Sequence, residues 1–305
     1  MENVIIAGSG PAGLTAAIYT ARSGLKPLVL SGFIPGGQLT VSEAVANYPG
    51  FFEPISGQEL MTRFRKQAER FGVRFKAKAI KNVTKTENAL EVDMGSEKIE
   101  TKALIIATGA QARRLQIPSE PKFYGRGISG CAVCDGSFFC DKHVLVIGGG
   151  DKAMQDAVLL TKFANKVTIV HRRDYLRASA IEIEKAKNNS KIEWLIPWIV
   201  QKILGKDTVA GVILKNTETE DVRELNCEGI FVAIGHDPKT EAFKDLVKID
   251  ENGFILVEPG STRTSMSGIF ACGDVCDPVY KQAAVAVGQG CMAALDLEKY
   301  LQKEK

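Results

Sequence analysis

The sequence predicts an α/β protein of two similar domains, one of them inserted into the other. Its length of 305 residues suits about two domains. Two apolar runs, at residues 4–7 and 143–147, each lead into a glycine-rich turn and a segment with helical spacing. A further apolar run ending in glycine follows each copy, at residues 104–109 and 230–235. A repeat on this scale indicates two copies of one βαβ plan.

The first copy begins with the apolar strand of residues 4–7 and a turn that contains Gly8, Gly10 and Gly13. Residues 14–23 then have helical spacing. In such a turn the first glycine permits a tight bend, the second lets the backbone approach a pyrophosphate, and the third lets the helix pack on the strand. The start of the helix offers free N–H groups to the phosphates. The first copy is therefore predicted to be a Rossmann-like dinucleotide-binding domain.

The second copy repeats this order with a turn that contains Gly148, Gly150 and Ala153, followed by a helix expected to continue to about Ala164. Alanine is an accepted variant of the third glycine. One glycine-rich turn is a weak signal, whereas two turns, each between a strand and a helix, are specific. The predicted fold class is therefore α/β with two Rossmann-like dinucleotide-binding domains.

The order of the signals indicates how the two copies share the chain. A third apolar run, residues 268–274, lies beyond the second copy and fits the first. The second domain is then an insertion, with linkers expected at residues 110–118 and 236–239. The predicted domains are residues 1–112 with 241–305, and the inserted residues 113–240.

The end of the second strand of each copy indicates which nucleotide binds there. An acid at this place accepts from ribose hydroxyls, whereas arginine accommodates a 2′-phosphate. The inserted copy has a basic cluster at this place, which favours NADPH. The cluster consists of His171, Arg172, Arg173 and Arg177.

The first copy has Ser31 and Gly32 where an acid is usual. Gly36 and Gly37 offer more backbone for close approach to a cofactor, and Asp274 supplies an acceptor for a ribityl hydroxyl. FAD therefore fits this half best. Taken alone, Asp274 could also cap a helix or a turn, but its context at the end of a predicted strand favours the contact with the cofactor.

Cys131 and Cys134 have the Cys-x-x-Cys spacing, in which a disulfide can close and reopen with little rearrangement. Asp135 follows directly and could supply the proton that a departing thiolate needs, or cap a helix. A zinc site is the alternative, because Cys140 and His143 complete a four-ligand spacing, although a metal knuckle against a nucleotide-binding strand would be unusual. The remaining cysteines are expected to be small buried residues: Cys140, Cys227, Cys272, Cys276 and Cys291.

Together these motifs resemble the low-molecular-weight bacterial thioredoxin reductases over nearly the whole chain. The matching segments are Gly-Ser-Gly-Pro-Ala-Gly at 8–13, Gly-Gly-Gln-Leu at 36–39, Cys-Ala-Val-Cys-Asp-Gly at 131–136, His-Arg-Arg-Asp at 171–174, Gly-Asp-Val at 273–275, Gln-Ala at 282–283 and Gly-Cys-Met-Ala-Ala at 290–294. The larger glutathione-reductase family places its cysteines near the first loop and has a dimerisation domain that 305 residues cannot hold. The chain departs from the family at Lys152 and Gln155, where a small hydroxyl residue and an acid are usual.

The resemblance implies a homodimeric flavoprotein that uses NADPH to reduce thioredoxin, with one FAD per subunit. It implies that Cys131 and Cys134 form the redox disulfide, with Cys134 facing the flavin, Cys131 attacking the substrate and Asp135 as the acid. The implied FAD contacts are Gly8, Gly10, Pro11, Ala12, Gly13, Ser31, Gly32, Gly36, Gly37, Gln38, Asn47, Thr108, Gly109, Gly273, Asp274, Val275, Gln282 and Ala283. The implied NADPH contacts are Gly148, Gly150, Asp151, Ala153, His171, Arg172, Arg173, Arg177, Ile234 and Gly235.

The cysteine pair and the NADPH loop lie in the same inserted domain, so they must alternate at one flavin unless they meet its opposite faces. A swivel about the two linkers is therefore expected. The same motifs would also serve another thioredoxin-like or peroxidase-linked partner. A ferredoxin- or flavodoxin-NADP oxidoreductase of this architecture would not need the two cysteines.

Composition and charge argue against other classes of protein. A hydrophobic fraction of 45% excludes a disordered chain, and the 39 basic and 36 acidic residues are too balanced for a nucleic-acid surface. No apolar run approaches the ~18 residues of a membrane span. Seven cysteines, an odd number, argue against a secreted disulfide framework. We therefore expect a cytoplasmic protein with no metal and no nucleic-acid or membrane partner.

Overall fold

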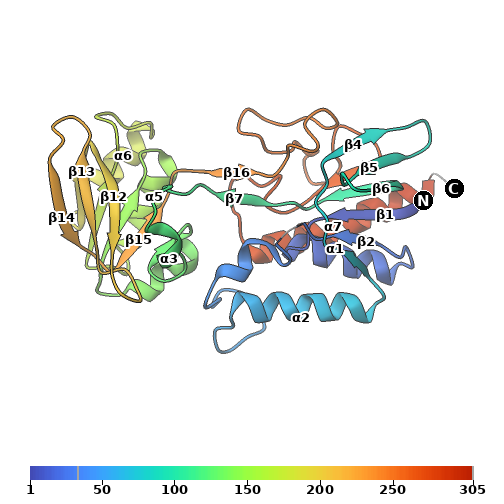
Figure 1. Ribbon diagram of the computed structural model, residues 1–305, viewed down its shortest axis with the longest axis horizontal. Helices are drawn as coiled ribbons and strands as arrows, with labels where there is room; N and C mark the ends of the chain where they lie inside the picture. The colour runs from blue at the N-terminus through green and yellow to red at the C-terminus, as the bar shows by residue number, and fades with distance from the viewer. Residues whose placement is uncertain (33, 304–305) are drawn as a thin grey trace. The chain divides into compact units, whose positions relative to one another are not determined.

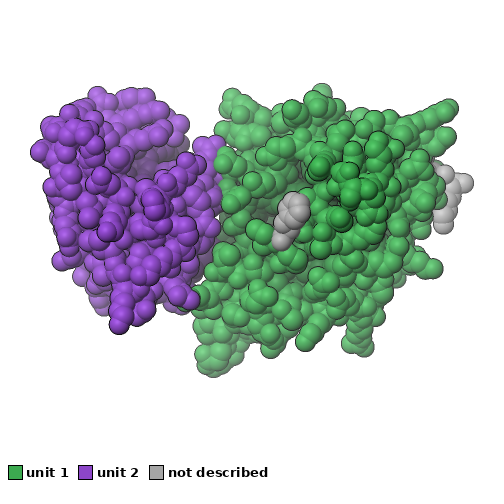
Figure 2. Space-filling model, in the orientation of Figure 1, with its two compact units in different colours: residues 1–111, 237–305 green, residues 112–236 purple. Residues whose placement is uncertain are grey.

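The computed structural model describes residues 1–32 and 34–303. The chain divides into two compact units (Figure 2): unit 1 is Met1–Gln111 with Asp237–Lys305, and unit 2 is Ala112–His236. Unit 2 is therefore inserted between two segments of unit 1. The first division falls one residue before the expected boundary at residue 112, and the second falls at residue 236 instead of 240.

Unit 1 is built on a seven-stranded sheet in the order β3-β2-β1-β6-β5-β4, with β17 paired to β6 (Figure 1). Its parallel strands are β1 (Glu2–Ala7), β2 (Leu28–Leu30), β3 (Arg74–Lys76), β6 (Lys98–Ile106) and β17 (Ile269–Ala271). β4 (Asn82–Lys85) and β5 (Leu90–Asp93) form an antiparallel edge. The third apolar run of the sequence therefore belongs to unit 1, because it supplies β17.

Strand β1 shows why the central strands of unit 1 are continuous apolar runs. Val4 and Ile6 belong to the core that also contains residues of α1 (Pro11–Arg22). Ile5 and Ala7 belong to a second core. Successive side chains of a strand point to opposite faces, so both faces of the sheet are covered, as a parallel sheet requires.

Unit 1 also contains the helices α1, α2 (Gly57–Arg70) and α7 (Ala283–Lys303) and the short 3₁₀ helix η1 (Gly37–Val41). Both α2 and α7 pack against α1. Leu60 and Met61 of α2 are buried, as the helical spacing predicts. The apolar spacing of residues 60–71 also predicts a buried Phe71, and this prediction is wrong: Phe71 lies just after the last turn of α2 and is 41% exposed.

Unit 2 contains a five-stranded sheet in the order β11-β10-β9-β15-β8. These strands are β8 (Ile128–Ser129), β9 (His143–Ile147), β10 (Lys166–Val170), β11 (Ile192–Leu195) and β15 (Gly229–Val232), all parallel. The helical segments are α3 (Glu120–Phe123), α4 (Ala132–Asp135), η2 (Gly136–Phe139), α5 (Asp151–Leu160) and α6 (Ala180–Lys187). An antiparallel sheet consists of β12 (Trp198–Leu204), β13 (Gly211–Asn216) and β14 (Val222–Asn226). The sequence patterns considered above predict no strand of this second sheet.

Two short strands carry the chain from one unit to the other. β7 (Ala110–Ala112) and β16 (His236–Pro238) pair with each other in a two-stranded sheet. They lie within the segments expected to be linkers. The crossings are therefore paired backbone and not two loose loops.

Two details of the expected elements need correction. Helix α5 ends at Leu160 and not near Ala164, because the chain turns after Thr161. Of the five cysteines expected to be buried, Cys227 and Cys272 are buried, but Cys276 and Cys291 are only half-buried. Cys140 is exposed, since it lies in the turn that follows η2. Within residues 1–32 and 34–303, no helix is both long and apolar enough to cross a bilayer.

Candidate active site

The first glycine-rich loop joins β1 to α1 and is held by backbone contacts. Gly8 has a φ of +111°, and a Cβ on it would lie 2.2 Å from the carbonyl oxygen of Ala107. A Cβ on Gly13 would lie 2.1 Å from the carbonyl oxygen of Gly8. By contrast, a Cβ on Gly10 would meet no atom within 4 Å. Gly10 therefore has open space beside it, at the start of a helix that has no side-chain cap.

A second segment of unit 1 lies against this loop. The backbone N–H of Gly36 donates to Ser9 Oγ at 3.0 Å, and a Cβ on Gly37 would lie 3.4 Å from Gly10 Cα. The structure therefore brings together two of the segments predicted to hold FAD. Ser31, at the end of β2, donates through its hydroxyl to the Lys76 carbonyl at 3.3 Å.

The segment after β17 also packs on α1. A Cβ on Gly273 would lie 2.8 Å from Ala12 Cβ, and the Gly273 N–H donates to Gln289 Oε1 at 2.7 Å. Asp274 follows, and burial raises the pKa of its carboxyl to about 6, with a further contribution from the nearby Asp277 carboxylate. A hydroxyl donor is a suitable partner for such a carboxyl.

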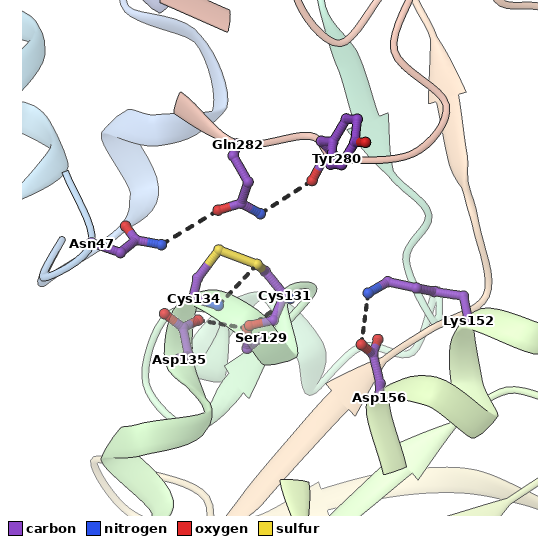
Figure 3. Close-up of a disulfide and its surroundings, with 9 residues drawn as sticks. All are labelled: Asn47, Ser129, Cys131, Cys134, Asp135, Lys152, Asp156, Tyr280 and Gln282. Carbon is purple, nitrogen blue, oxygen red and sulfur yellow. Dashed lines mark hydrogen bonds and ion pairs between the residues drawn. A yellow bond between two sulfur atoms is a disulfide. The ribbon is translucent and has the colours of Figure 1, made fainter. Parts of the chain in front are cut away.

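The other residues expected at FAD lie at two further places in unit 1. Asn47 Nδ2 donates to Gln282 Oε1 at 3.4 Å, which joins two segments distant in sequence (Figure 3). Thr108 Oγ1 donates to the carbonyl of Lys239 at 2.7 Å, and Gly109 accepts from the Lys239 N–H at 2.9 Å. Thr108 and Gly109 therefore hold the segment in which the chain re-enters unit 1 after unit 2.

Gly290 was placed in a matching motif, but its packing role was not predicted. A Cβ on Gly290 of α7 would lie 2.3 Å from the carbonyl oxygen of Ala12. Small residues at 283–294, most of them Ala or Gly, are the signal that could have indicated a close helix contact. Helix α7 therefore closes directly on the turn that begins α1.

The second glycine-rich loop joins β9 to α5 in unit 2. A Cβ on Gly148 would lie 2.4 Å from the Ala233 carbonyl oxygen, whereas one on Gly150 would meet no atom within 4 Å. This repeats the contrast between Gly8 and Gly10. Asp151 already forms a hydrogen bond within the chain, because its Oδ1 accepts from the Ser179 N–H at 2.6 Å.

A strap of residues 171–178 folds back over this second loop. His171 is buried, and a Cβ on Gly149 would lie 2.4 Å from its ring. The Arg177 N–H donates to the Gly149 carbonyl at 2.8 Å. Burial lowers the pKa of His171, so the packed imidazole is neutral near pH 7. The neighbouring Arg172 and the side chain of Arg177 are exposed.

Arg173 and the end of β15 complete the expected NADPH residues. Arg173 Nη1 donates to the Tyr175 hydroxyl at 2.9 Å, which fixes part of the basic cluster. Gly235, which follows Ile234, accepts from the Arg113 N–H at 3.0 Å. The strap and these residues all belong to unit 2.

Lys152 forms an ion pair just inside the second loop. Its Nζ lies 2.6 Å from Oδ1 of Asp156, one turn further along α5 (Figure 3). Asp156 is buried while the Lys152 side chain is about half exposed. Burial raises the pKa of Asp156, and Lys152 opposes that shift. Lys152, which departs from the family pattern, therefore supplies the cation that pairs with the buried carboxylate of Asp156.

Cys131 and Cys134 form a disulfide at the start of α4. Val133, between them, is 57% exposed, so the pair lies at the surface of unit 2. Asp135 is half-buried, and burial raises the pKa of its carboxyl while a hydrogen bond from Ser129 lowers it. A carboxyl of this kind keeps its proton to a higher pH than an exposed one and is suited to act as an acid.

The structure offers little for the zinc alternative. Two of its four expected ligands are joined in the disulfide, and His143 Nε2 lies 2.8 Å from Thr168 Oγ1. Among the residues described, no group of three or more potential ligands could hold a metal ion.

Burial raises the pKa of the Cys227 and Cys276 thiols to about 12, which makes them poor nucleophiles.

Comparison with known proteins identifies relatives over the whole chain. Residues 2–290 match the family described as pyridine nucleotide-disulphide oxidoreductase. The chain is 46% identical to the thioredoxin reductase of Rickettsia conorii over 304 residues, which covers 98% of each chain. It is 45% identical to the thioredoxin reductase of Mycolicibacterium smegmatis, again over 304 residues, covering 100% of this chain and 98% of the relative.

Solved structures give the same result. The thioredoxin reductase from Streptococcus pyogenes MGAS5005 superposes with a TM-score of 0.95 at 40% identity and covers 99% of both chains. The thioredoxin reductase of Lactococcus lactis in its FR conformation gives a TM-score of 0.67, also at 40% identity, over 99% of this chain and 100% of that chain. Each likeness spans both units, so the fold class expected from the two glycine-rich turns is confirmed.

Proposed function

Because the chain belongs to the pyridine nucleotide-disulphide oxidoreductases and, among them, to the low-molecular-weight thioredoxin reductases, we propose that it uses NADPH to reduce the disulfide of a thioredoxin. The electrons pass through FAD and the Cys131–Cys134 disulfide. NADPH, a proton and the thioredoxin disulfide give NADP⁺ and the thioredoxin dithiol. The observation that carries this proposal is a surface disulfide, followed by a half-buried carboxyl, in the same unit as the second glycine-rich loop.

Unit 1 is proposed to hold FAD, and its loop supports this. The open side of Gly10 lies at the uncapped start of α1, where backbone N–H groups and the helix dipole favour a pyrophosphate. Gly36 and Gly37 keep the neighbouring segment close to that loop. The Asp274 carboxyl is proposed to accept a hydrogen bond from a ribityl hydroxyl.

Unit 2 is proposed to bind NADPH in the same manner at Gly150. The basic residues of the strap lie directly after β10, the place from which a dinucleotide-binding domain contacts the 2′-position of the ribose. Guanidinium groups form charge-assisted hydrogen bonds to phosphate, which favours NADPH over NADH. Arg172, Arg173 and Arg177 are proposed for this contact.

When bound, FAD accepts a hydride from NADPH and delivers two electrons to a disulfide. Cys134 is proposed to receive these electrons, and with two protons the bond between Cys131 and Cys134 becomes two thiols. The Cys131 thiolate then attacks the thioredoxin disulfide, forms a mixed disulfide and expels one thioredoxin thiolate. Cys134 attacks the mixed disulfide, closes the bond to Cys131 and releases the second thiolate. The two protons that Cys131 and Cys134 lose pass to the two thioredoxin thiolates, and Asp135 supplies or takes up the proton at the departing sulfur.

We propose that unit 2 swivels about β7 and β16 between the two half-reactions, because it holds both the disulfide and the NADPH loop. Two relatives of equal identity, 40%, give TM-scores of 0.95 and 0.67. TM-scores differ in this way when relatives hold two such units at different angles to each other. A homodimer and a cytoplasmic location belong to the same proposal.

The purified protein should be yellow, with an absorption band near about 450 nm, and that band should bleach on addition of NADPH. With thioredoxin present, NADPH oxidation should continue until the thioredoxin disulfide is consumed. A colourless protein that cannot be reconstituted with FAD would contradict the proposal. Bleaching without turnover on thioredoxin, but with turnover on another thioredoxin-like protein, would reassign the partner.

A further inference from the structure

Ser129 is a buried hydroxyl beside the redox disulfide that the proposed mechanism does not use. It ends β8, two residues before Cys131, and is 6% exposed. Its Oγ lies 2.5 Å from Asp135 Oδ2 and 2.9 Å from the backbone nitrogen of Cys131 (Figure 3). Ser129 therefore connects the proposed acid to the backbone of the proposed attacking cysteine.

The direction of these hydrogen bonds follows from the number of hydrogens. The Cys131 N–H can only donate, so Ser129 Oγ accepts from it. The single hydroxyl hydrogen of Ser129 is then left for one acceptor. Asp135 Oδ2 lies at 2.5 Å and the Cys131 carbonyl oxygen at 3.3 Å, so the carboxyl is the better acceptor. The chain of bonds runs from the Cys131 N–H through Ser129 to Asp135.

We propose that Ser129 is a positioning residue for Asp135: its hydroxyl fixes one carboxyl oxygen relative to Cys131 and thereby sets when the acid gives up its proton. The inference rests on the proposed function, because it needs Asp135 to act as the acid. The role proposed for Ser129 is exerted through Asp135, by the hydrogen bond between Ser129 Oγ and Asp135 Oδ2.

The electrostatics around Asp135 support this role. Burial raises the pKa of Asp135, and the hydrogen bond from Ser129 is what opposes that rise. Without the hydroxyl, the carboxyl should keep its proton to a still higher pH. An acid that holds its proton more tightly donates it less readily, and it takes it back more readily in the reverse direction.

The other titratable and charged groups described near Asp135 would be unchanged by a substitution at Ser129. Tyr124 lies near Gly130, and Asp135 contributes to raising the pKa of its phenol, which burial raises most. Arg114 lies over the Tyr124 ring, 3.2 Å from its centroid. The carboxylate of Glu120 accepts from the N–H groups of two nearby residues, Leu115 and Gln116.

The facing helix contributes one ion pair and one further carboxylate, Asp151, which accepts a hydrogen bond from the Ser179 N–H. Helix α5 packs against α4 and carries Lys152 and Asp156, which neutralise each other. A change in the pH profile on removal of the Ser129 hydroxyl would therefore report Asp135 and not a new neighbour.

The test uses the FAD-loaded protein with the variants Ser129→Ala, Ser129→Thr and Asp135→Asn. Thioredoxin turnover is measured as a function of pH, and NADPH reduction of the flavin is measured without thioredoxin. Thr208→Ala, which removes an exposed hydroxyl between β12 and β13, is the matched control. Ser129→Ala should lower thioredoxin turnover about tenfold. The pH above which turnover declines should move to a higher value. Ser129→Thr should restore both, and NADPH reduction of the flavin should be equal in the Ser129 variants and the wild-type protein.

Three outcomes would overturn the inference. If Ser129→Ala follows the wild-type pH profile, or loses turnover at every pH without a shift, Ser129 does not position the acid. If Ser129→Thr fails to rescue a folded Ser129→Ala variant, the hydroxyl is not the cause. Should Ser129→Ala not fold, Ser129→Val, which has the shape of Thr without its hydroxyl, provides the same comparison with Ser129→Thr. Full turnover in Asp135→Asn would instead contradict the proposed function, and so separates the two failures.

Discussion

The two glycine-rich loops of this chain follow one plan and are held in different ways. In unit 1, backbone lies against backbone: Gly13 approaches the Gly8 carbonyl, and Gly290 of α7 approaches the Ala12 carbonyl. In unit 2, Ala153 takes the third position, and the ring of a buried His171 packs on the loop. The middle glycines, Gly10 and Gly150, have open space in both units.

The difference teaches that a shared loop geometry does not fix the ligand. Unit 1 closes tightly around its loop, which suits a cofactor that stays bound. Unit 2 surrounds its loop with charge, namely an ion pair inside the helix and a basic strap beyond the strand. Such a site suits a nucleotide that is selected by charge and leaves after each turnover. Unit 2 alone also carries the disulfide.

Cys134→Ser separates the work of the two units and should have the largest effect. Thioredoxin reduction should fall by about 1,000-fold or more, because no disulfide can form within unit 2. Reduction of the flavin by NADPH should be unaffected. Steady-state turnover and rapid-mixing absorbance measure the two reactions, with exposed Cys140→Ser as the control. Retained thioredoxin turnover would show that the pair is not the electron carrier.

Gly10→Ala and Gly150→Ala compare the two loops directly. The added methyl group meets no atom of the chain at either position, so both variants should fold. It would occupy the space proposed for a pyrophosphate, and a misplaced ligand loses about 100-fold in affinity or rate. Gly10→Ala should lower the flavin content, and Gly150→Ala should raise KM for NADPH with a full flavin content. The reverse pattern would exchange the ligands of the two units.

The basic strap is tested by replacing Arg172 and Arg173 with Ala. Loss of charge-assisted bonds to the 2′-phosphate should raise KM for NADPH about thirtyfold and leave KM for NADH nearly unchanged. Lys202→Ala, an exposed cation on β12 of the same unit, is the control. An equal rise for both nucleotides would mean that the strap does not contact the 2′-phosphate.

Lys152→Ala sharpens the comparison at the smallest scale. Asp156 would lose its partner, and the free energy of unfolding should fall by about 1 kcal/mol at neutral pH. Burial already raises the pKa of Asp156 in the native protein. As pH rises, Asp156 therefore loses its proton in the unfolded chain before it does so in the native protein, and its contribution to native stability falls. Removing the cation raises that pKa further. Urea denaturation should therefore show a loss at neutral pH that vanishes below the ordinary carboxyl pKa; a loss of equal size at every pH would exclude this cause.

Much of the fold could be predicted because its signals are local. Strand β1 and the turn after it are contiguous in sequence, and a parallel strand buried on both faces is apolar throughout. The three-stranded sheet of β12, β13 and β14 was not predicted, because its strands are only partly apolar and lack a glycine-rich signature. Phe71 and Cys140 were misplaced because exposure at the end of an element depends on what packs over it.

The site divides in the same way. Cys-x-x-Cys and the glycine spacings are local chemistry, and they indicated the disulfide and both loops. The small residues of α7 could indicate a close helix contact, but Ala12 is so far away in sequence that no spacing identifies it as the partner of Gly290. Ser129 and Asp135 are close in sequence, but the direction of the hydroxyl depends on how the strand that ends at Ser129 and the helix that ends at Asp135 are placed. Lys152 was noticed as a departure, and only the structure shows its partner.

The central claim is that electrons from NADPH pass through the flavin into the bond between Cys131 and Cys134. An anaerobic titration with NADPH, monitored by flavin absorbance and by counting thiols in the denatured product, tests it most directly. The flavin and the disulfide each accept two electrons, so the wild-type protein should take up about two equivalents per chain and gain two thiols, and Cys134→Ser should take up about one and gain none. One equivalent and no new thiol in the wild-type protein would contradict the claim.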